Sequence, residues 1–196
     1  MKVLGILWTT IKDHLVVKVS KPTECSSKRE VLKSIAKVFD PLVFFTPATL
    51  RGKLFLQDLW ASKKEWDEKL DEEMLHKWMK LRNEMECISM VTIPRFIGNS
   101  NCQLLCFCDA STKAHASVIY LSSDAGVNLL FSKARVAPIK KLGTPRLELL
   151  AVLIDVRMLN FVQEQLQLPM EKKFLWTDNQ CVLHWIMGKK PLITFV

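Results

Sequence analysis

Two apolar stretches of the sequence each end on an aspartate. LLCFCDAS reaches Asp109 and KFLWTDNQ reaches Asp178, and small or polar residues follow both. An aspartate at such a place is commonly a turn residue, because Asp ends strands and starts turns. A metal site at the edge of a sheet needs the same residue type, because hard divalent cations prefer carboxylate oxygens. A single ending of this kind favours the turn, so the choice depends on the rest of the chain.

A third carboxylate lies between the two aspartates. Glu148 belongs to TPRLELLAVLIDVRMLNFVQEQL, residues 144–166, which predicts one long helix, and leucines surround it. Burying a carboxylate is costly unless something compensates for it. If the two strands are neighbours and the helix packs across them, the three acids converge, and a divalent cation removes their repulsion. The sequence therefore predicts a metal site of Asp109, Glu148 and Asp178.

The elements that must position these acids follow from the spacing of apolar residues. Residues 101–111, 114–123 and 127–137 predict three short strands of an antiparallel meander. The long helix comes next, then a fourth strand within residues 173–180 and a short helix. The prediction for this half of the chain is an α/β domain with the order β-β-β-α-β-α.

The first 95 residues have a different pattern. VLGILW predicts one strand and LVVKV a second, joined as a hairpin, and three helices are predicted after them. In the first helix the apolar residues at helical spacing predict the buried stripe; they are Leu32, Ile35, Ala36 and Phe39. Thr46 and Thr144 each precede a proline, which predicts an N-cap followed by proline at the first helical position.

Composition sets limits on the class of protein. The 196 residues are 49% hydrophobic and 24% charged, which is typical of a folded chain. The net charge is +8 and is spread over both halves, so a polyanionic partner is permitted without being required. No apolar run approaches the roughly 20 residues that cross a bilayer, so no membrane partner is expected.

The six cysteines show no metal-binding spacing. No CxxC occurs, and no second pair of ligands stands at the loop spacing of a zinc site. Cys106 and Cys108 flank Phe107, so both are expected on the strand face opposite that ring. We interpret the cysteines as buried thiols of a reducing intracellular compartment, either cytoplasmic or nuclear.

Several longer stretches resemble the polymerase–ribonuclease H region of BEL/Pao-type retrotransposon polyproteins. They cover nearly the whole chain and include KREVLKSIAKVFDPL, TLRGKLFLQDLW, KARVAPIKKLGTPRLELLA and WTDNQCVLHWI. The resemblance implies a C-terminally truncated ribonuclease H-like fold, a mixed sheet with flanking helices, at residues 96–196. Residues 1–95 would be a mainly helical region, with an N-terminal hairpin, like the primer grip, thumb and connection of a reverse transcriptase. No adjacent Asp-Asp pair occurs, so no polymerase activity is expected.

The same resemblance implies a chemistry. Family members hydrolyse the RNA strand of RNA–DNA hybrids with Mg²⁺ or Mn²⁺, and Asp109, Glu148 and Asp178 take three of the four positions for catalytic metal ligands. No Asp or Glu follows Asp178, and His115-Ala116 stands where the family usually has Tyr-Gly. A weak or inactive endonuclease is therefore expected of the isolated chain. The alternative is a non-catalytic nucleic-acid-binding or interaction remnant, and the remainder of the Pol polyprotein is the other expected partner.

Two further interpretations concern residues near the predicted site. A run of basic residues without an acid between them either neutralises phosphates of nucleic acid or forms a solvated loop; it consists of Lys133, Arg135, Lys140, Lys141 and Arg146. Asp155 lies two helical turns after Glu148 on the same helix face. We expect it to be a surface residue, because a lone aspartate is seldom fully buried.

Overall fold

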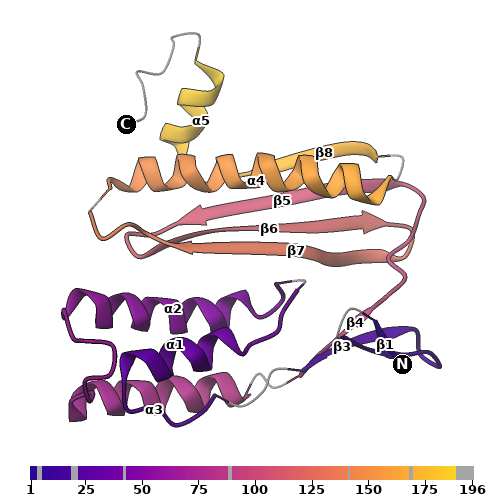
Figure 1. Ribbon diagram of the computed structural model, residues 1–196. Helices are drawn as coiled ribbons and strands as arrows, with labels where there is room; N and C mark the ends of the chain where they lie inside the picture. Colours follow the sequence, from indigo (N-terminus) through magenta and orange to yellow (C-terminus); the bar gives the residue numbers. More distant parts are fainter. Residues whose placement is uncertain are drawn as a thin grey trace. The chain divides into compact units, whose positions relative to one another are not determined.

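The computed structural model describes residues 1–3, 6–18, 22–41, 43–87, 90–140, 142–167 and 170–188. The chain forms two compact units, Met1–Phe96 and Ile97–Val196 (Figure 1). The first combines a small sheet with three helices, and the second has a larger sheet with a long helix along it. Among the described residues, no helix has both the length and the apolarity that a bilayer crossing requires.

The sheet of the first unit has four antiparallel strands in chain order. They are β1 (Lys2–Val3), β2 (Ile6–Thr9), β3 (His14–Lys18) and β4 (Met90–Pro94). The prediction of one strand over VLGILW is wrong, because Val3 pairs with Ile6 and the stretch forms two strands. Strand β4 was not predicted. Its partner β3 is far away in sequence, and the Arg95 guanidinium joins the strand ends by donating to the Asp13 carboxylate at 2.6 Å.

Three helices form the core of the first unit. They are α1 (Lys28–Ala36), α2 (Thr46–Ala61) and α3 (Glu72–Cys87). Helix α1 begins after Ser27, whose side chain accepts a hydrogen bond from the backbone N–H of Glu30. The buried residues that pack together are Cys25, Val31, Ile35, Ala48, Phe55, Leu59, Leu70, Trp78, Leu81 and Met85.

The buried face of α1 differs from the prediction. Val31 and Ile35 are buried, whereas Leu32 is 38% exposed. The buried face of α1 is therefore rotated toward Val31, away from the predicted Leu32. Lys28 accounts for this, because its aliphatic stem lies on the buried face and its ammonium is 4.6 Å from the Trp60 ring centre. A lysine can bury its aliphatic stem along apolar surface in this way.

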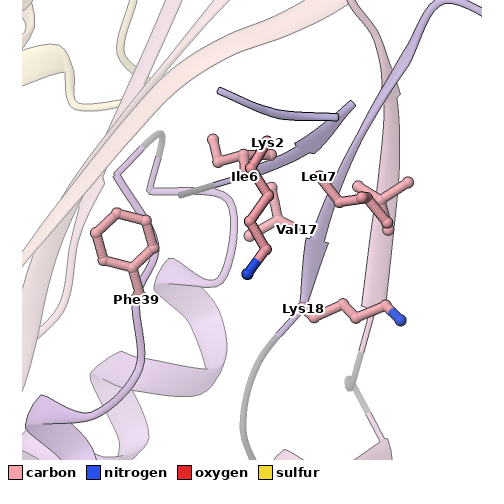
Figure 2. A pocket seen from close by; sticks show the side chains of 7 residues that line it. Lys2, Ile6, Leu7, Val17, Lys18 and Phe39 are labelled. Carbon is pink, nitrogen blue, oxygen red and sulfur yellow. The ribbon is translucent and has the colours of Figure 1, made fainter. Parts of the chain in front are cut away.

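Phe39, the last residue of the predicted stripe, lies beyond α1. Its ring is 54% exposed and lines a pocket of about 260 Å³ against the small sheet. Figure 2 shows the ring facing Lys2 and Ile6. The helical spacing of apolar residues therefore extends to Phe39 in the sequence, whereas the helix itself ends at Ala36.

The N-caps of α2 and of the long helix α4 (Thr144–Leu166) also differ from the prediction. Phe45 and Gly143 are the N-cap residues, so Thr46 and Thr144 are already helical. Before α2 the Asp40 carboxylate replaces a side-chain cap, because it accepts from the backbone N–H of Phe45 at 2.6 Å. A carboxylate there satisfies a donor that the start of the helix leaves free.

The rotated face of α1 can be checked with two neighbouring substitutions. Val31→Ala should lower the free energy of unfolding by about 2 kcal/mol, because it removes buried methyl groups and leaves a cavity. Leu32→Ala should cost less than about 1 kcal/mol, because that side chain is partly in water. Urea unfolding measures both. A larger loss for Leu32→Ala would support the face predicted from the sequence instead.

The sheet of the second unit has four strands in the order β7-β6-β5-β8. They are β5 (Cys102–Ala110), β6 (Ala114–Ser123), β7 (Gly126–Val136) and β8 (Met170–Trp176). Strands β5, β6 and β7 form an antiparallel meander, and β8 joins β5 in parallel. The predicted mixed sheet, with the first and last strands as neighbours, is confirmed.

Helix α4 (Thr144–Leu166) connects β7 to β8 along one face of this sheet, and α5 (Gln180–Met187) follows β8 (Figure 1). Apolar side chains fill the space beneath α4; they are Cys102, Leu104, Cys106, Ile119, Leu121, Ile154, Met158, Leu159 and Val162. The buried Ser117 hydroxyl donates to the carbonyl oxygen of Ala151 at 3.0 Å. This bond ties the middle strand to the helix above it.

The cysteines confirm the predicted strand alternation. Cys106 and Cys108 are buried on the α4 side, while Phe107 between them is 42% exposed on the other side. Cys25 and Cys102 are buried as well, but Cys181 is exposed, so the prediction of buried thiols is wrong there. Cys181 is near the start of α5, whose one buried residue is Val182. The side chain of Cys87 lies outside the described residues.

Candidate metal centre

Strand pairing brings the two aspartates to one edge of the sheet. Asp109 is the penultimate residue of β5, and Asp178 follows the end of β8 by two residues. Phe107 pairs with Trp176 in parallel register, so each aspartate comes two residues after a paired position. Glu148 stands near the start of α4, which passes over this edge. Oxygen atoms of the three carboxylates all lie within 4.8 Å of one another, so the predicted convergence is confirmed.

The chain on either side of the aspartates is held by local hydrogen bonds. Ser111 shapes the turn after Asp109, because its hydroxyl accepts from the backbone N–H groups of Lys113 and Ala114 at 3.2 Å. Asn179 caps α5 by accepting from the backbone N–H of Val182 at 3.1 Å. Both aspartates therefore sit beside turns that other side chains build. Both aspartates are exposed and their carboxylates belong to the cluster, and one Asp109 oxygen also accepts from the backbone N–H of Ala110 at 2.7 Å.

Glu148 has the most unusual surroundings of the three. The residue is 4% exposed, and its Oε2 atom has no hydrogen-bond partner within the described part of the chain. Burial raises the pKa of the Glu148 carboxyl, the negative charges of Asp109 and Asp178 raise it further, and a backbone hydrogen bond from Ala110 opposes the rise. A buried oxygen without a partner is costly, and a cation would satisfy it.

The donor set suits a hard cation. All three candidate ligands are carboxylates, and Mg²⁺ and Mn²⁺ bind such oxygens in preference to nitrogen or sulfur. A divalent ion would offset the repulsion among the acids and pair with the orphaned Glu148 oxygen. The residues present therefore fit a magnesium or manganese ion.

The predicted basic residues are divided between β7 and the segment after it. Arg135 of β7 pairs with His115 of β6, which in turn pairs with Ala110 of β5. The exposed Arg135 is therefore two strands away from Ala110, the residue that follows Asp109. Lys133 is half-buried further along β7, Lys140 is exposed in the following loop, and Arg146 is in the first turn of α4. Lys141 lies outside the described residues. Contact of these residues with nucleic acid stays a prediction.

His115 stands where the retrotransposon sequences that this chain resembles usually have tyrosine. It is 5% exposed on β6, and its Nδ1 has no hydrogen-bond partner in the described chain. Burial lowers the pKa of His115, and the nearby Arg135 charge lowers it further. The ring is therefore a neutral core histidine at neutral pH.

The prediction of a surface position for Asp155 is wrong. Its side chain is fully buried at 0% exposure, between α4 and the strands that carry Ser117 and Cys108. The Ser117 hydroxyl donates elsewhere, to the Ala151 carbonyl, and neither Asp155 oxygen has a hydrogen-bond partner among the described residues. Burial raises the pKa of Asp155 to about 6, although the polar Ser117 and Cys108 side chains act to lower it. Its seven-residue spacing from Glu148 on one helix already indicated this inward face.

Similarity to known proteins extends over most of the chain. The family described as Pao retrotransposon-like RNaseH-like domain matches residues 27–179. A foamy viral protease-reverse transcriptase in complex with double-stranded DNA is similar, at 14% identity and a TM-score of 0.47, over 87% of this chain and 28% of that one. A foamy viral protease-reverse transcriptase in complex with an RNA/DNA hybrid gives 12% identity and a TM-score of 0.46, over 83% and 21%. The chain thus spans about a quarter of the length of these structures, and no curated protein matches it.

Proposed function

The chain belongs to the family of Pao retrotransposon-like RNaseH-like domains, and we propose that its second unit is a metal-dependent nuclease module for the RNA strand of RNA–DNA hybrids. The observation that carries the proposal is the cluster of Asp109, Glu148 and Asp178 within 4.8 Å. A structural role for three acids is poorly supported, because the buried Glu148 oxygen has no partner in the described chain. Stability alone would favour an apolar residue there.

In this proposal the three carboxylates hold Mg²⁺ or Mn²⁺ at the β5–β8 edge. A bound cation of this kind polarises a phosphodiester and neutralises charge that develops on its oxygens. The chain itself fixes the ligands, because β5 and β8 hold the two aspartates in register and α4 presents Glu148 from a buried position. In the same proposal the exposed Arg135 and Lys140 neutralise phosphates of the bound strand.

The number of acids limits the expected rate. Two-metal hydrolysis uses one ion at the attacking oxygen and a second at the leaving oxygen, and residues 179–196 contain no Asp or Glu. Three carboxylates are enough for one ion. We therefore expect the 196-residue polypeptide to bind a divalent cation more readily than it cleaves. Binding of hybrid without cleavage is the second candidate function, and the same count of acids favours it.

Digestion of a labelled RNA–DNA hybrid tests the proposal. With the polypeptide in excess and Mn²⁺ present, we expect slow cleavage of the RNA strand, and Asp109→Asn should reduce the rate by at least about 100-fold, because it removes a metal ligand. Glu164→Gln is the matched control, since Glu164 is an exposed acid on α4 outside the cluster. Metal-dependent binding without cleavage would select the second candidate. Equal cleavage by Asp109→Asn would overturn the assignment of the site.

A further inference from the structure

A group of polar side chains lies buried beneath α4 and includes none of the three candidate metal ligands. Asp155 is 0% exposed and Ser117 is 2% exposed, and the side chains of Ser117 and Cys108 are the polar neighbours of the Asp155 carboxyl. The Cys106 thiol is also close enough to respond to the charge of Asp155. The proposed function uses none of these residues, although burying an acid costs stability.

The hydrogen-bond donors beside Asp155 are engaged with other acceptors. The Ser117 hydroxyl donates to the Ala151 carbonyl at 3.0 Å, and the Cys108 thiol donates to the Trp176 carbonyl at 3.6 Å. Neither Asp155 oxygen therefore has a hydrogen-bond partner in the described chain. This arrangement suits a neutral carboxyl, which can itself donate to a sulfur or oxygen atom, whereas a carboxylate can only accept.

The bond from Cys108 to Trp176 lies next to the proposed metal site. Cys108 immediately precedes Asp109 on β5, and Trp176, the last residue of β8, precedes Asp178 by two residues. In the parallel register of the two strands, the last pair is Phe107 with Trp176. The thiol therefore joins β5 to β8 at the end of their pairing, just before the two aspartates.

Among these buried side chains, Asp155 is the one that titrates near neutral pH. The titratable groups that face it are the thiols of Cys106 and Cys108 on β5, and burial raises the pKa of both to about 12. Ser117 faces it from β6, and within the described chain no charged side chain of β5, β6, β8 or α5 contributes to the shift of the Asp155 pKa. Glu148, two turns earlier on α4, has a raised pKa of its own, so an experiment must separate the two acids.

We propose that Asp155 is a positioning residue for the carboxylate cluster: when it loses its proton to solvent, it takes the hydrogen bond of the Cys108 thiol away from the Trp176 carbonyl and loosens the β5–β8 edge. A carboxylate is the stronger acceptor, because hydrogen bonds to ionised groups are about twice as strong as neutral ones. Rotation about the Cβ–Sγ bond redirects the thiol proton without moving the sulfur atom. The thiol yields before the Ser117 hydroxyl, since S–H is the weaker donor.

The direction of the pH dependence follows from the burial of Asp155. Burial raises its pKa to about 6, so the edge should be joined by the thiol below this pH and looser above it. Because a thiol is a weak donor, it offsets only a small part of the cost of the buried charge. The link to metal binding rests on the proposed function, whereas the pairing of β5 with β8 can be measured in EDTA without any metal.

Hydrogen exchange of backbone amides, measured by NMR in EDTA at pH 5 and pH 7.5 and corrected for intrinsic rates, tests the proposal. Strand β8 is an edge strand that pairs with β5, so its protected amides at residues 174–176 report this pairing. Relative to amides in the middle of β6, they should exchange about fivefold faster at pH 7.5 than at pH 5, since one weak bond between the strands is lost. The ratio to β6 removes changes in global stability.

Variants assign the response to one acid and one thiol. Asp155→Asn should abolish the pH dependence, because asparagine does not titrate, and Glu148→Gln should keep it. Cys108→Ala and Cys106→Ala are a matched pair, because both remove a buried thiol near Asp155 and, in the described chain, it is Cys108 that bonds to β8. Cys108→Ala should give fast exchange at both pH values, whereas Cys106→Ala should keep the response. Circular dichroism checks that each variant is folded.

Several outcomes would overturn the proposal. A pH response that survives in Asp155→Asn or disappears in Glu148→Gln would assign the change to the carboxylate cluster itself. Equal behaviour of the two cysteine variants would remove the thiol from the mechanism. A wild-type exchange ratio that is the same at both pH values would show that ionised Asp155 leaves the strand pairing intact. Failure of Mn²⁺ binding or of hybrid cleavage would bear on the proposed function alone, because the exchange measurements contain no metal.

Discussion

Replacing Asp155 by asparagine should stabilise the protein at neutral pH by about 3 kcal/mol. Asp155 is fully buried, and its pKa rises from 3.8 to about 6. A shift of about two units corresponds to about 3 kcal/mol between the two protonation states. The folded state holds the proton more tightly than the unfolded state, so stability falls as pH rises from about 4 to about 6 and is then level. An asparagine of nearly the same shape has no charge to bury.

The measurement is urea unfolding of the wild-type chain and of Asp155→Asn at pH 4 and pH 7.5, followed by circular dichroism. The two chains should be similar at pH 4 and differ most at pH 7.5. Glu148 contributes a decline of the same sign, because its pKa is also raised, and subtracting the variant isolates the part due to Asp155. Glu164→Gln on the same helix should change neither value. A destabilised Asp155→Asn at pH 7.5 would mean that the ionised carboxylate has a compensating partner.

Glu148→Gln should have opposite effects with and without a divalent cation. In EDTA the variant should be more stable than the wild type, because glutamine removes the repulsion from Asp109 and Asp178 and the cost of a buried charge. With Mn²⁺ at about 100 times its dissociation constant, the wild type should gain about 2.7 kcal/mol, while the variant should gain little. The order of stability should therefore reverse when Mn²⁺ is added.

Thermal unfolding with EDTA and with MnCl₂ measures this reversal. Glu164→Gln again serves as the control, and it should follow the wild type in both conditions. Mn²⁺ that stabilises wild type and Glu148→Gln equally would show that the ion binds elsewhere. An unstable variant in EDTA would show that Glu148 has a structural partner in place of a ligand.

Local sequence patterns predicted the second unit better than the first. The bounds of α4 agree with the prediction within one residue, and β5, β6 and β7 agree within about two residues, because their apolar periods are regular and turns separate them. The acids of the site could be proposed because Asp109 and Asp178 end similar stretches. Their distance depended on β8 pairing with β5, which no local pattern specifies.

Most of the remaining differences have their physical origin in tertiary contacts. Strand β4 exists because β3 pairs with it, and the face of α1 is set by the burial of Lys28 against Trp60. The helices after Phe45 and Gly143 begin without the threonine caps that the sequence indicated. Asp155 was assigned to the surface because of its charge, although its position on α4 placed it inside. For β4, α1 and Asp155, contacts with residues distant in sequence decided between two locally reasonable options, whereas the start of α2 depends on the nearby Asp40.

The parallel pairing of β5 with β8 has a consequence for synthesis on the ribosome. About 60 residues separate the end of β5 from the start of β8, and at about 5–20 residues per second they take several seconds to be translated. During that interval β5 is an open edge with unpaired backbone groups, which can pair with another nascent chain. The strand that completes the carboxylate cluster therefore also covers this open edge. A chaperone that shields β5 until β8 emerges should raise the yield of folded protein.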